Sequence, residues 1–147
     1  MSMSTPQTIL LIHGPNLNLL GTREPAVYGS ATLHDHVNTA TEAAKKYGVV
    51  VTAVQSNAEH DIVECVQTAN GTYDAIIINP GALTHYSWAL HDALRSFTGP
   101  IIEVHLSNPS ARENFRHTSV VAPIAMGTIS GFGGAGYQLA VEALCHP

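Results

Sequence analysis

Positive charge is scarce in this sequence. Only six of the 147 residues are lysine or arginine, against eleven aspartates and glutamates, and the formal net charge is -5. A surface that binds nucleic acid needs a cluster of cations to neutralise phosphates. We therefore expect neither DNA nor RNA as a partner.

Long hydrophobic runs are also lacking. No apolar run approaches the roughly 20 residues that a helix needs to cross a bilayer. Residues 1–7 have neither the basic start nor the apolar core of a secretory signal. These two absences predict a cytoplasmic protein that does not bind membranes.

Cysteine is limited to Cys65 and Cys145, which lack the paired spacing of a zinc or redox motif. Two isolated thiols are typical of a reducing compartment, where they pack as ordinary side chains. The nine histidines do not form a recognisable metal motif, because His34 and His36 are two residues apart on a predicted helix and face different sides. We expect no metal site.

The length and the 45% hydrophobic content indicate a single domain over residues 1–147. Strands are expected from Ile9 to the stop at Gly14-Pro15, at 49–54, 74–78 and 101–104, with a fifth starting at 120–121; helices are expected at 32–47, 58–69, 86–96 and 132–144, with a helical turn at 109–115. This alternation predicts an α/β fold, a flavodoxin-like three-layer sandwich around a five-stranded parallel sheet.

The segment from Gly14 to Ala31 is much longer than the connections of about two to six residues that usually join a strand to a helix. It carries Arg23 and Tyr28 and is punctuated by glycine and proline. Such a segment is typical of a lid or binding loop. We expect it to be mobile without ligand and ordered by an anionic ring.

Polar side chains follow three of the predicted strands. Asn16, Asn79 and His105 each come just after a strand. Because the carboxyl ends of parallel strands meet at the edge where α/β proteins bind ligands, these residues are expected in one site. Arg112 and Arg116 lie in loop-like segments, as Arg23 does, and favour an anionic substrate.

Four separated segments stand out: 14–25 (GPNLNLLGTREP, with Tyr28-Gly29 behind it), 79–82 with 84–87 (NPGA and THYS), 103–108 (EVHLSN) and 112–117 (RENFRH). Together they resemble the signature of type II 3-dehydroquinate dehydratases. The resemblance covers essentially the whole chain. It implies dehydration of 3-dehydroquinate to 3-dehydroshikimate without a cofactor, by anti elimination through an enolate. That reaction serves the shikimate pathway to chorismate and the aromatic amino acids, or quinate catabolism.

Lysine is nearly absent, and this bears on the mechanism. The only lysines, Lys45 and Lys46, end a predicted helix far in sequence from every motif segment. A route that attaches the ketone to a lysine as an iminium therefore lacks a nucleophile. A non-covalent general acid/base mechanism is left, and the resemblance implies the same.

Tyr28 is the candidate base of that mechanism. A phenol has a reference pKa of about 10, so a nearby cation must stabilise the phenolate. Arg23 and Arg112 are the two candidates for this cation. The alternative for Tyr28 is a loop aromatic that only packs against the lid.

His105 is the candidate acid that protonates the departing hydroxyl. Glu103 has the same strand parity, so its carboxylate can orient the imidazole and favour the imidazolium. Asn16 is expected to hold a water or the enolate oxygen through its amide. The alternatives are an ordinary hydrogen-bonded histidine and, for Asn16, a helix or turn cap.

The resemblance also implies the binding residues. Asn79, the backbone N–H of Leu106 and the hydroxyl of Ser107 are expected to hold the substrate carboxylate, and His85, Arg112 and Arg116 complete the substrate site. Asp92 is expected to reach a neighbouring subunit in a homo-oligomer, a dodecamer built from trimers. The alternative for Asp92 is a solvated helix acid.

Residues 131–136 have the GxGxxG spacing of a dinucleotide motif, but the chain ends before the acidic residue expected about 20 positions later. We interpret them as a flexible turn into the last helix. A rival function remains for the whole chain: a flavodoxin-like module that binds or senses a small molecule without turnover. Tyr28, Arg23, Asn16 and His105 together argue against it, since a binder needs no activated phenol.

Overall fold

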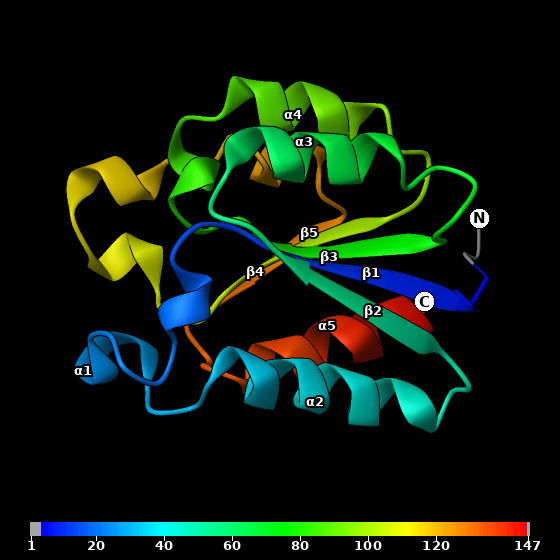
Figure 1. The fold of residues 1–147 in the computed structure, drawn as a ribbon, viewed down its shortest axis with the longest axis horizontal. Coiled ribbons are helices and arrows are strands. Elements are labelled where there is room, and N and C mark those ends of the chain that lie inside the picture. Colours follow the sequence, from blue (N-terminus) through cyan, green and yellow to red (C-terminus); the bar gives the residue numbers. More distant parts are fainter. Residues whose placement is uncertain (1–3, 147) are drawn as a thin grey trace.

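The computed structural model describes residues 4–146, which form a three-layer α/β sandwich (Figure 1). Five parallel strands make one sheet in the order β2-β1-β3-β4-β5. Their bounds are β1 Thr8–His13, β2 Val50–Gln55, β3 Ala75–Asn79, β4 Ile101–His105 and β5 Gly127–Ser130. This confirms the flavodoxin-like strand order predicted from the sequence.

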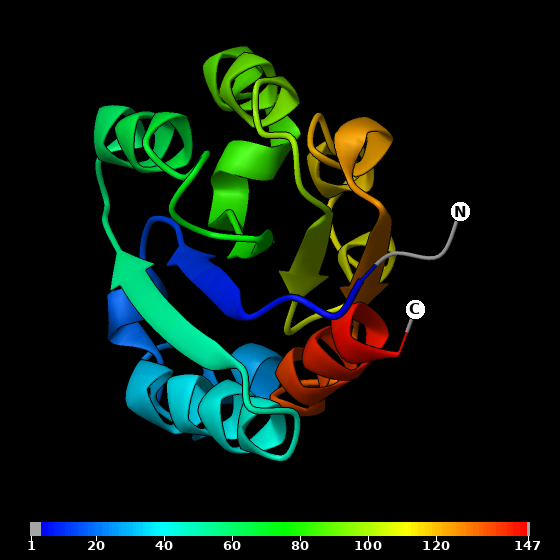
Figure 2. The same ribbon diagram turned by 90° about the vertical axis from the view of Figure 1, so that its right-hand side faces the viewer.

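Helices cover both faces of the sheet. The α-helices are α1 Pro25–Tyr28, α2 Leu33–Lys45, α3 Glu59–Gln67, α4 Trp88–Arg95 and α5 Ala135–Cys145; the 3-10 helices are η1 Leu17–Leu19, η2 Gly81–His85, η3 Pro109–Ala111, η4 Asn114–His117 and η5 Ala122–Ile124. The end-on view in Figure 2 shows α2 and α5 on one face and α3 and α4 on the other. Within residues 4–146 no helix combines the length and apolarity needed to cross a membrane.

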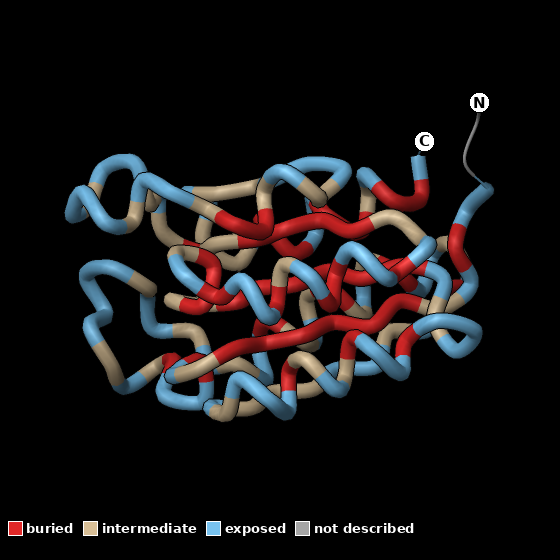
Figure 3. The backbone as a smooth tube through the Cα atoms, turned by 90° about the horizontal axis from the view of Figure 1, so that it is seen from above, coloured by how far each residue is buried: buried red, intermediate tan, exposed pale blue. Residues whose placement is uncertain are grey.

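The central strands are buried because helices pack on both of their faces (Figure 3). Along β1 the side chains alternate between two cores. Ile9 and Leu11 pack toward α2 and α5, whereas Leu10 and Ile12 pack toward α3 and α4. Strand β2 lies at an edge of the sheet, and its Val50 is 62% exposed.

Local signals explain where α2 begins. Thr32 caps the helix as predicted: its hydroxyl accepts a hydrogen bond from the backbone of Asp35, and the Asp35 carboxylate accepts one from the backbone of Thr32. The helix ends at Lys45, just before Gly48 turns the chain with a φ of 70°. Lys46 then forms an ion pair with Glu142 of α5, which ties the two helices of this layer together.

The fifth strand does not lie where the sequence pattern predicts it. Val120 and Val121 form a bend before η5, and β5 is Gly127–Ser130. The Val120 backbone N–H donates to the carbonyl of Thr84 at 2.7 Å, and the Val121 N–H donates to the Ser119 hydroxyl at 3.1 Å. Both valines are therefore buried without pairing in the sheet, while the true edge strand has little hydrophobic character.

The last helix also begins later than predicted, at Ala135 rather than Phe132. Gly131 and Gly133 have φ values of 93° and 56°, which an α-helix cannot contain. The interpretation of residues 131–136 as a turn into this helix is confirmed. The predicted helical turn at 109–115 is instead two 3-10 helices, η3 and η4.

Candidate active site

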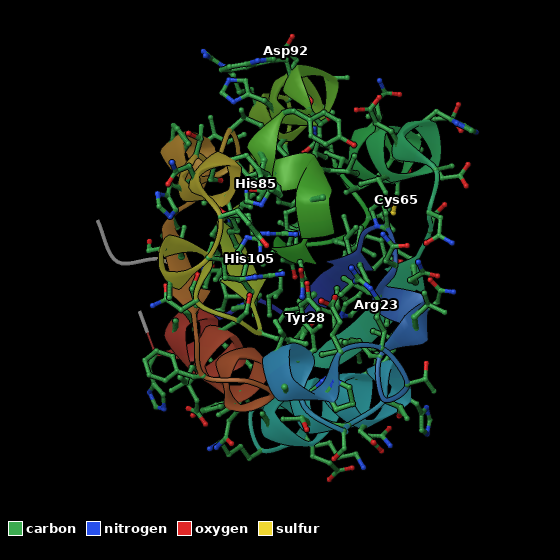
Figure 4. All side chains as sticks on the ribbon, turned by 90° about the vertical axis from the view of Figure 1, so that its left-hand side faces the viewer. Arg23, Tyr28, Cys65, His85, Asp92 and His105 are labelled. Carbon is green, nitrogen blue, oxygen red and sulfur yellow. The ribbon has the colours of Figure 1, made fainter. Side chains whose placement is uncertain are left out.

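A cavity opens beyond the carboxyl ends of the strands, between the segment 14–31 and η2, η3 and η4 (Figure 4). Ten of the twelve site residues predicted from the sequence line it: Asn16, Arg23, Tyr28, Asn79, His85, His105, Leu106, Ser107, Arg112 and Arg116. The two that do not are Glu103 and Asp92. The strand-end rule thus placed Asn16, Asn79 and His105 in one cavity, as expected.

Tyr28 is the last residue of α1 and faces two cations. The guanidinium carbon of Arg23 lies 5.4 Å from the centre of the Tyr28 ring, and that of Arg112 lies 5.3 Å away. Arg23 also forms a 3.1 Å ion pair with Glu24 at the cavity rim. Both arginines proposed as the partner cation therefore contact the phenol, one from its own segment and one from the opposite wall.

The segment 14–31 is not an irregular loop throughout, because it contains η1 and α1. Two of its non-glycine residues have left-handed backbones, Asn16 with a φ of 70° and Glu24 with a φ of 42°. Such conformations are costly and concentrate at functional sites. Asn16 occupies the N-cap position of η1, yet its side chain makes no capping hydrogen bond and lines the cavity instead.

His105 is paired with a buried carboxylate. Its Nε2 lies 2.6 Å from Oε2 of Glu103, so the two side chains share a face as their parity predicts. Glu103 is only 1% exposed and sits behind His105 rather than in the cavity wall. Burial opposes ionisation of Glu103, but hydrogen bonds from His105, Thr84 and Ser119 outweigh it and lower the pKa of the carboxyl.

Two further residues, Thr84 and Ser119, belong to this buried group and were not predicted from the sequence. The Thr84 hydroxyl donates to Oε2 of Glu103, and the Ser119 hydroxyl donates to Oε1 at 2.9 Å. Thr84 lies in a motif segment, which could have drawn attention to it. Ser119 carries no such signal. It is 16 residues away from Glu103 in the sequence, and only the packing of its loop brings the two side chains together.

The remaining wall combines cations and neutral donors. Nη1 of Arg112 donates to the Ser107 hydroxyl at 3.1 Å. Arg116 pairs with Glu113 through Nε and lies over the ring of Phe115. His85 uses Nδ1 to bond the carbonyl of Thr118 at 2.7 Å, which leaves its Nε2 edge for the cavity.

Asp92 stands apart from these groups. It is an exposed residue of α4, and Figure 4 shows it at the outer end of the molecule, far from Tyr28 and His105. A single chain therefore does not bring Asp92 to its own cavity. Among residues 4–146, no group of three His, Cys, Asp or Glu side chains is arranged to hold a metal ion.

The sequence of this chain matches a family of known proteins. The model of the family described as dehydroquinase class II matches residues 7–145. The chain belongs to this family. The 3-dehydroquinate dehydratase of Roseiflexus castenholzii is 57% identical over 136 residues, covering 92% of this chain and 87% of that protein. The enzyme of the same name from Aeromonas hydrophila is 52% identical over 144 residues, covering 98% and 97%.

Solved class II dehydroquinase structures have the same fold. The type II dehydroquinase from Propionibacterium acnes superimposes with a TM-score of 0.92 at 39% identity, over 99% of this chain and 100% of that one. The type II dehydroquinase from Butyrivibrio crossotus gives a TM-score of 0.90 at 48% identity, over 94% and 97%. The match includes the sheet edge that carries the cavity.

Behind the cavity, this class II dehydroquinase chain buries a polar cluster, of which only Asn79 was predicted from the sequence. His13, Asn79 and Tyr137 are each at most 3% exposed. Burial lowers the pKa of His13 to about 4; the backbone of Val54 opposes that shift and the neighbouring His36 adds to it. His13 is therefore neutral in the folded protein at neutral pH.

This neutral histidine should make folding sensitive to acid. Because the folded pKa of about 4 lies below the ordinary value of 6.5, the unfolded chain binds the proton first as pH falls through this range. The free energy of unfolding should therefore fall by about 3 kcal/mol between pH 6.5 and 4 from His13 alone. Urea unfolding at several pH values measures this slope.

The test variant is His13→Asn. Its matched control is His60→Asn, because His60 is an exposed histidine of α3. His13→Asn removes the buried proton site and should flatten the slope relative to the unaltered chain. His60→Asn should leave the slope unchanged. Equal slopes for the unaltered chain and His13→Asn would contradict the prediction.

Proposed function

We propose that this chain dehydrates 3-dehydroquinate to 3-dehydroshikimate, with Tyr28 as base and His105 as acid. The observation that carries the proposal is one cavity holding both halves of the chemistry. A phenol faces two guanidinium groups there, and an imidazole is backed by a buried carboxylate. The names of the relatives agree with this substrate.

The reaction begins at the carbon next to the ketone. The Tyr28 phenolate, stabilised by Arg23 and Arg112, removes a proton from that carbon, and the electron pair moves onto the ketone oxygen to form an enolate. Asn16 stabilises this oxygen directly or through a water. No lysine lines the cavity among the described residues, so the acid/base route uses groups that are present.

The second step expels the hydroxyl on the neighbouring carbon. The enolate collapses, the carbon–oxygen bond breaks, and the imidazolium of His105 supplies the proton that turns the leaving hydroxyl into water. Glu103 holds the imidazole in place through their 2.6 Å contact. Base and acid act from opposite faces of the ring, which makes the elimination anti.

The other wall residues hold the ring. In this proposal Asn79, the backbone N–H of Leu106 and the Ser107 hydroxyl bind the carboxylate, and His85 and Arg116 contact the hydroxyls. Arg112 orients Ser107 through their 3.1 Å hydrogen bond. The segment that carries Arg23 and Tyr28 closes over the substrate and excludes water.

We further propose that the enzyme works in the cytoplasm without cofactor, nucleic acid or membrane. It assembles as a dodecamer built from trimers, in which Asp92 reaches the cavity of a neighbouring subunit. The exposed position of Asp92 on α4 fits this role better than a role within its own chain. Genomic neighbours would distinguish a biosynthetic role in the shikimate pathway from quinate catabolism.

The test is ultraviolet absorbance of metal-stripped protein mixed with 3-dehydroquinate, because the conjugated enone product absorbs where the substrate does not. A rising signal that survives borohydride treatment in the presence of substrate supports the dehydratase and argues against a lysine imine. Binding of the anionic ring by folded protein without any signal would favour the non-catalytic binding module.

A further inference from the structure

The buried cluster behind the cavity joins a wall residue to the centre of the molecule. His13 and Asn79 are register partners at the ends of the neighbouring strands β1 and β3, and Tyr137 reaches them from α5. Nε2 of His13 lies 3.0 Å from the Tyr137 hydroxyl, and Nδ2 of Asn79 lies 3.1 Å from the same oxygen. Of the three residues, only Asn79 lines the cavity.

The glycine-rich turn before α5 makes room for this cluster. His36 of α2 stacks on Tyr137 with ring centres 5.3 Å apart. A Cβ on Gly134 would lie 2.9 Å from Nδ1 of His36, so a larger residue would displace the stack. The last glycine of the GxGxxG spacing also has a packing explanation, because a Cβ on Gly136 would lie 3.3 Å from Cγ1 of Val104 in β4.

The partners of Asn79 fix the orientation of its amide, and the tautomer of His13 then sets the direction of the bond to Tyr137. Oδ1 of Asn79 accepts from the backbone N–H of Gly81 at 3.3 Å, so its Nδ2 must be the group that faces Tyr137. The Tyr137 oxygen then accepts from Asn79, and its own proton is free to go to Nε2 of His13. Neutral His13 provides that acceptor when its proton is on Nδ1.

We propose that Tyr137 is a positioning residue that orients the Asn79 amide for an anionic ligand. With Oδ1 held by Gly81 and one Nδ2 proton held by Tyr137, the second Nδ2 proton is the part of the amide left to face the cavity. It donates to a carboxylate oxygen of the substrate. This inference rests on the proposed function for the identity of that carboxylate.

His13 sets the direction of the Tyr137 hydrogen bond. If the histidine could not accept, the hydroxyl proton would turn toward Asn79 and favour the flipped amide, which presents a carbonyl oxygen to the cavity. A carbonyl oxygen repels a carboxylate, whereas an N–H attracts it. Removing either the Tyr137 hydroxyl or the His13 acceptor should therefore weaken ligand binding in the same way.

The experiment measures the Kd of quinate, a ring carboxylate without the ketone, by calorimetry, together with KM and kcat for 3-dehydroquinate. Tyr137→Phe should raise Kd and KM about tenfold, the effect of losing one charge-assisted hydrogen bond, and change kcat by less than about threefold. His13→Leu should shift Kd in the same direction. In an Asn79→Ala background, Tyr137→Phe should have no further effect on Kd.

Tyr47→Phe is the matched control, because it removes a tyrosine hydroxyl that contacts Glu142 and His146 instead of the cavity. It should leave Kd and KM unchanged. Equal effects of Tyr137→Phe with and without Asn79, or a loss of kcat at unchanged KM, would overturn the inference. A third outcome separates the two proposals. If the protein does not turn over 3-dehydroquinate but Tyr137→Phe weakens quinate binding only when Asn79 is present, the proposed reaction is rejected and the positioning role is kept.

Discussion

Tyr28→Phe should lower kcat by about 10³ while leaving the affinity for 3-dehydroquinate within a few fold, the size expected when a general base is lost. The substitution removes only the hydroxyl. The ring stays between Arg23 and Arg112, whose guanidinium carbons lie 5.4 Å and 5.3 Å from its centre. The proposed substrate-binding walls therefore remain in place, and the lost group is the proposed base.

Steady-state kinetics and calorimetric binding separate the two effects. Tyr73→Phe is the matched control, because Tyr73 packs against the core beside α3 and α4 and does not line the cavity. It should retain full turnover. Near-normal kcat in Tyr28→Phe would remove Tyr28 from the role of base and shift attention to the other polar groups of the wall.

The position of the site could be predicted from the sequence because it depends on local patterns. Apolar runs followed by Asn16, Asn79 and His105 identify strand ends, and parallel strands bring their ends to one edge. The alternation of Glu103 and His105 along one strand was enough to pair them. Each of these inferences needs only short-range periodicity and the rule for parallel sheets.

What could not be predicted depends on contacts between distant segments. Ser119 reaches Glu103, and Tyr137 reaches His13, only after the loops and α5 have packed. Val120 and Val121 were misassigned for a related reason. Hydrophobicity reports burial, and their loop buries both valines, Val121 in the core under α3 and α4, without any pairing in the sheet.

His105→Asn should lower kcat by about 10² to 10⁴, because the leaving hydroxyl would depart without a proton from a positioned acid. The variant also leaves the carboxylate of Glu103 buried with the Thr84 and Ser119 hydroxyls as its remaining partners. Thermal unfolding of the same sample shows whether the fold is kept. The control is His60→Asn on the surface of α3, which should behave like the unaltered enzyme.

Glu103→Gln tests whether the buried carboxylate assists His105. The lowered pKa of Glu103 means that this buried group is a carboxylate at neutral pH, and it attracts the N–H of the imidazole ring 2.6 Å away. A neutral amide of nearly the same shape loses that attraction. Glu103→Gln should therefore lower kcat about tenfold or more while leaving KM for 3-dehydroquinate within a few fold, as steady-state kinetics would measure. Unchanged kcat in a folded Glu103→Gln variant would show that the buried carboxylate does not assist His105.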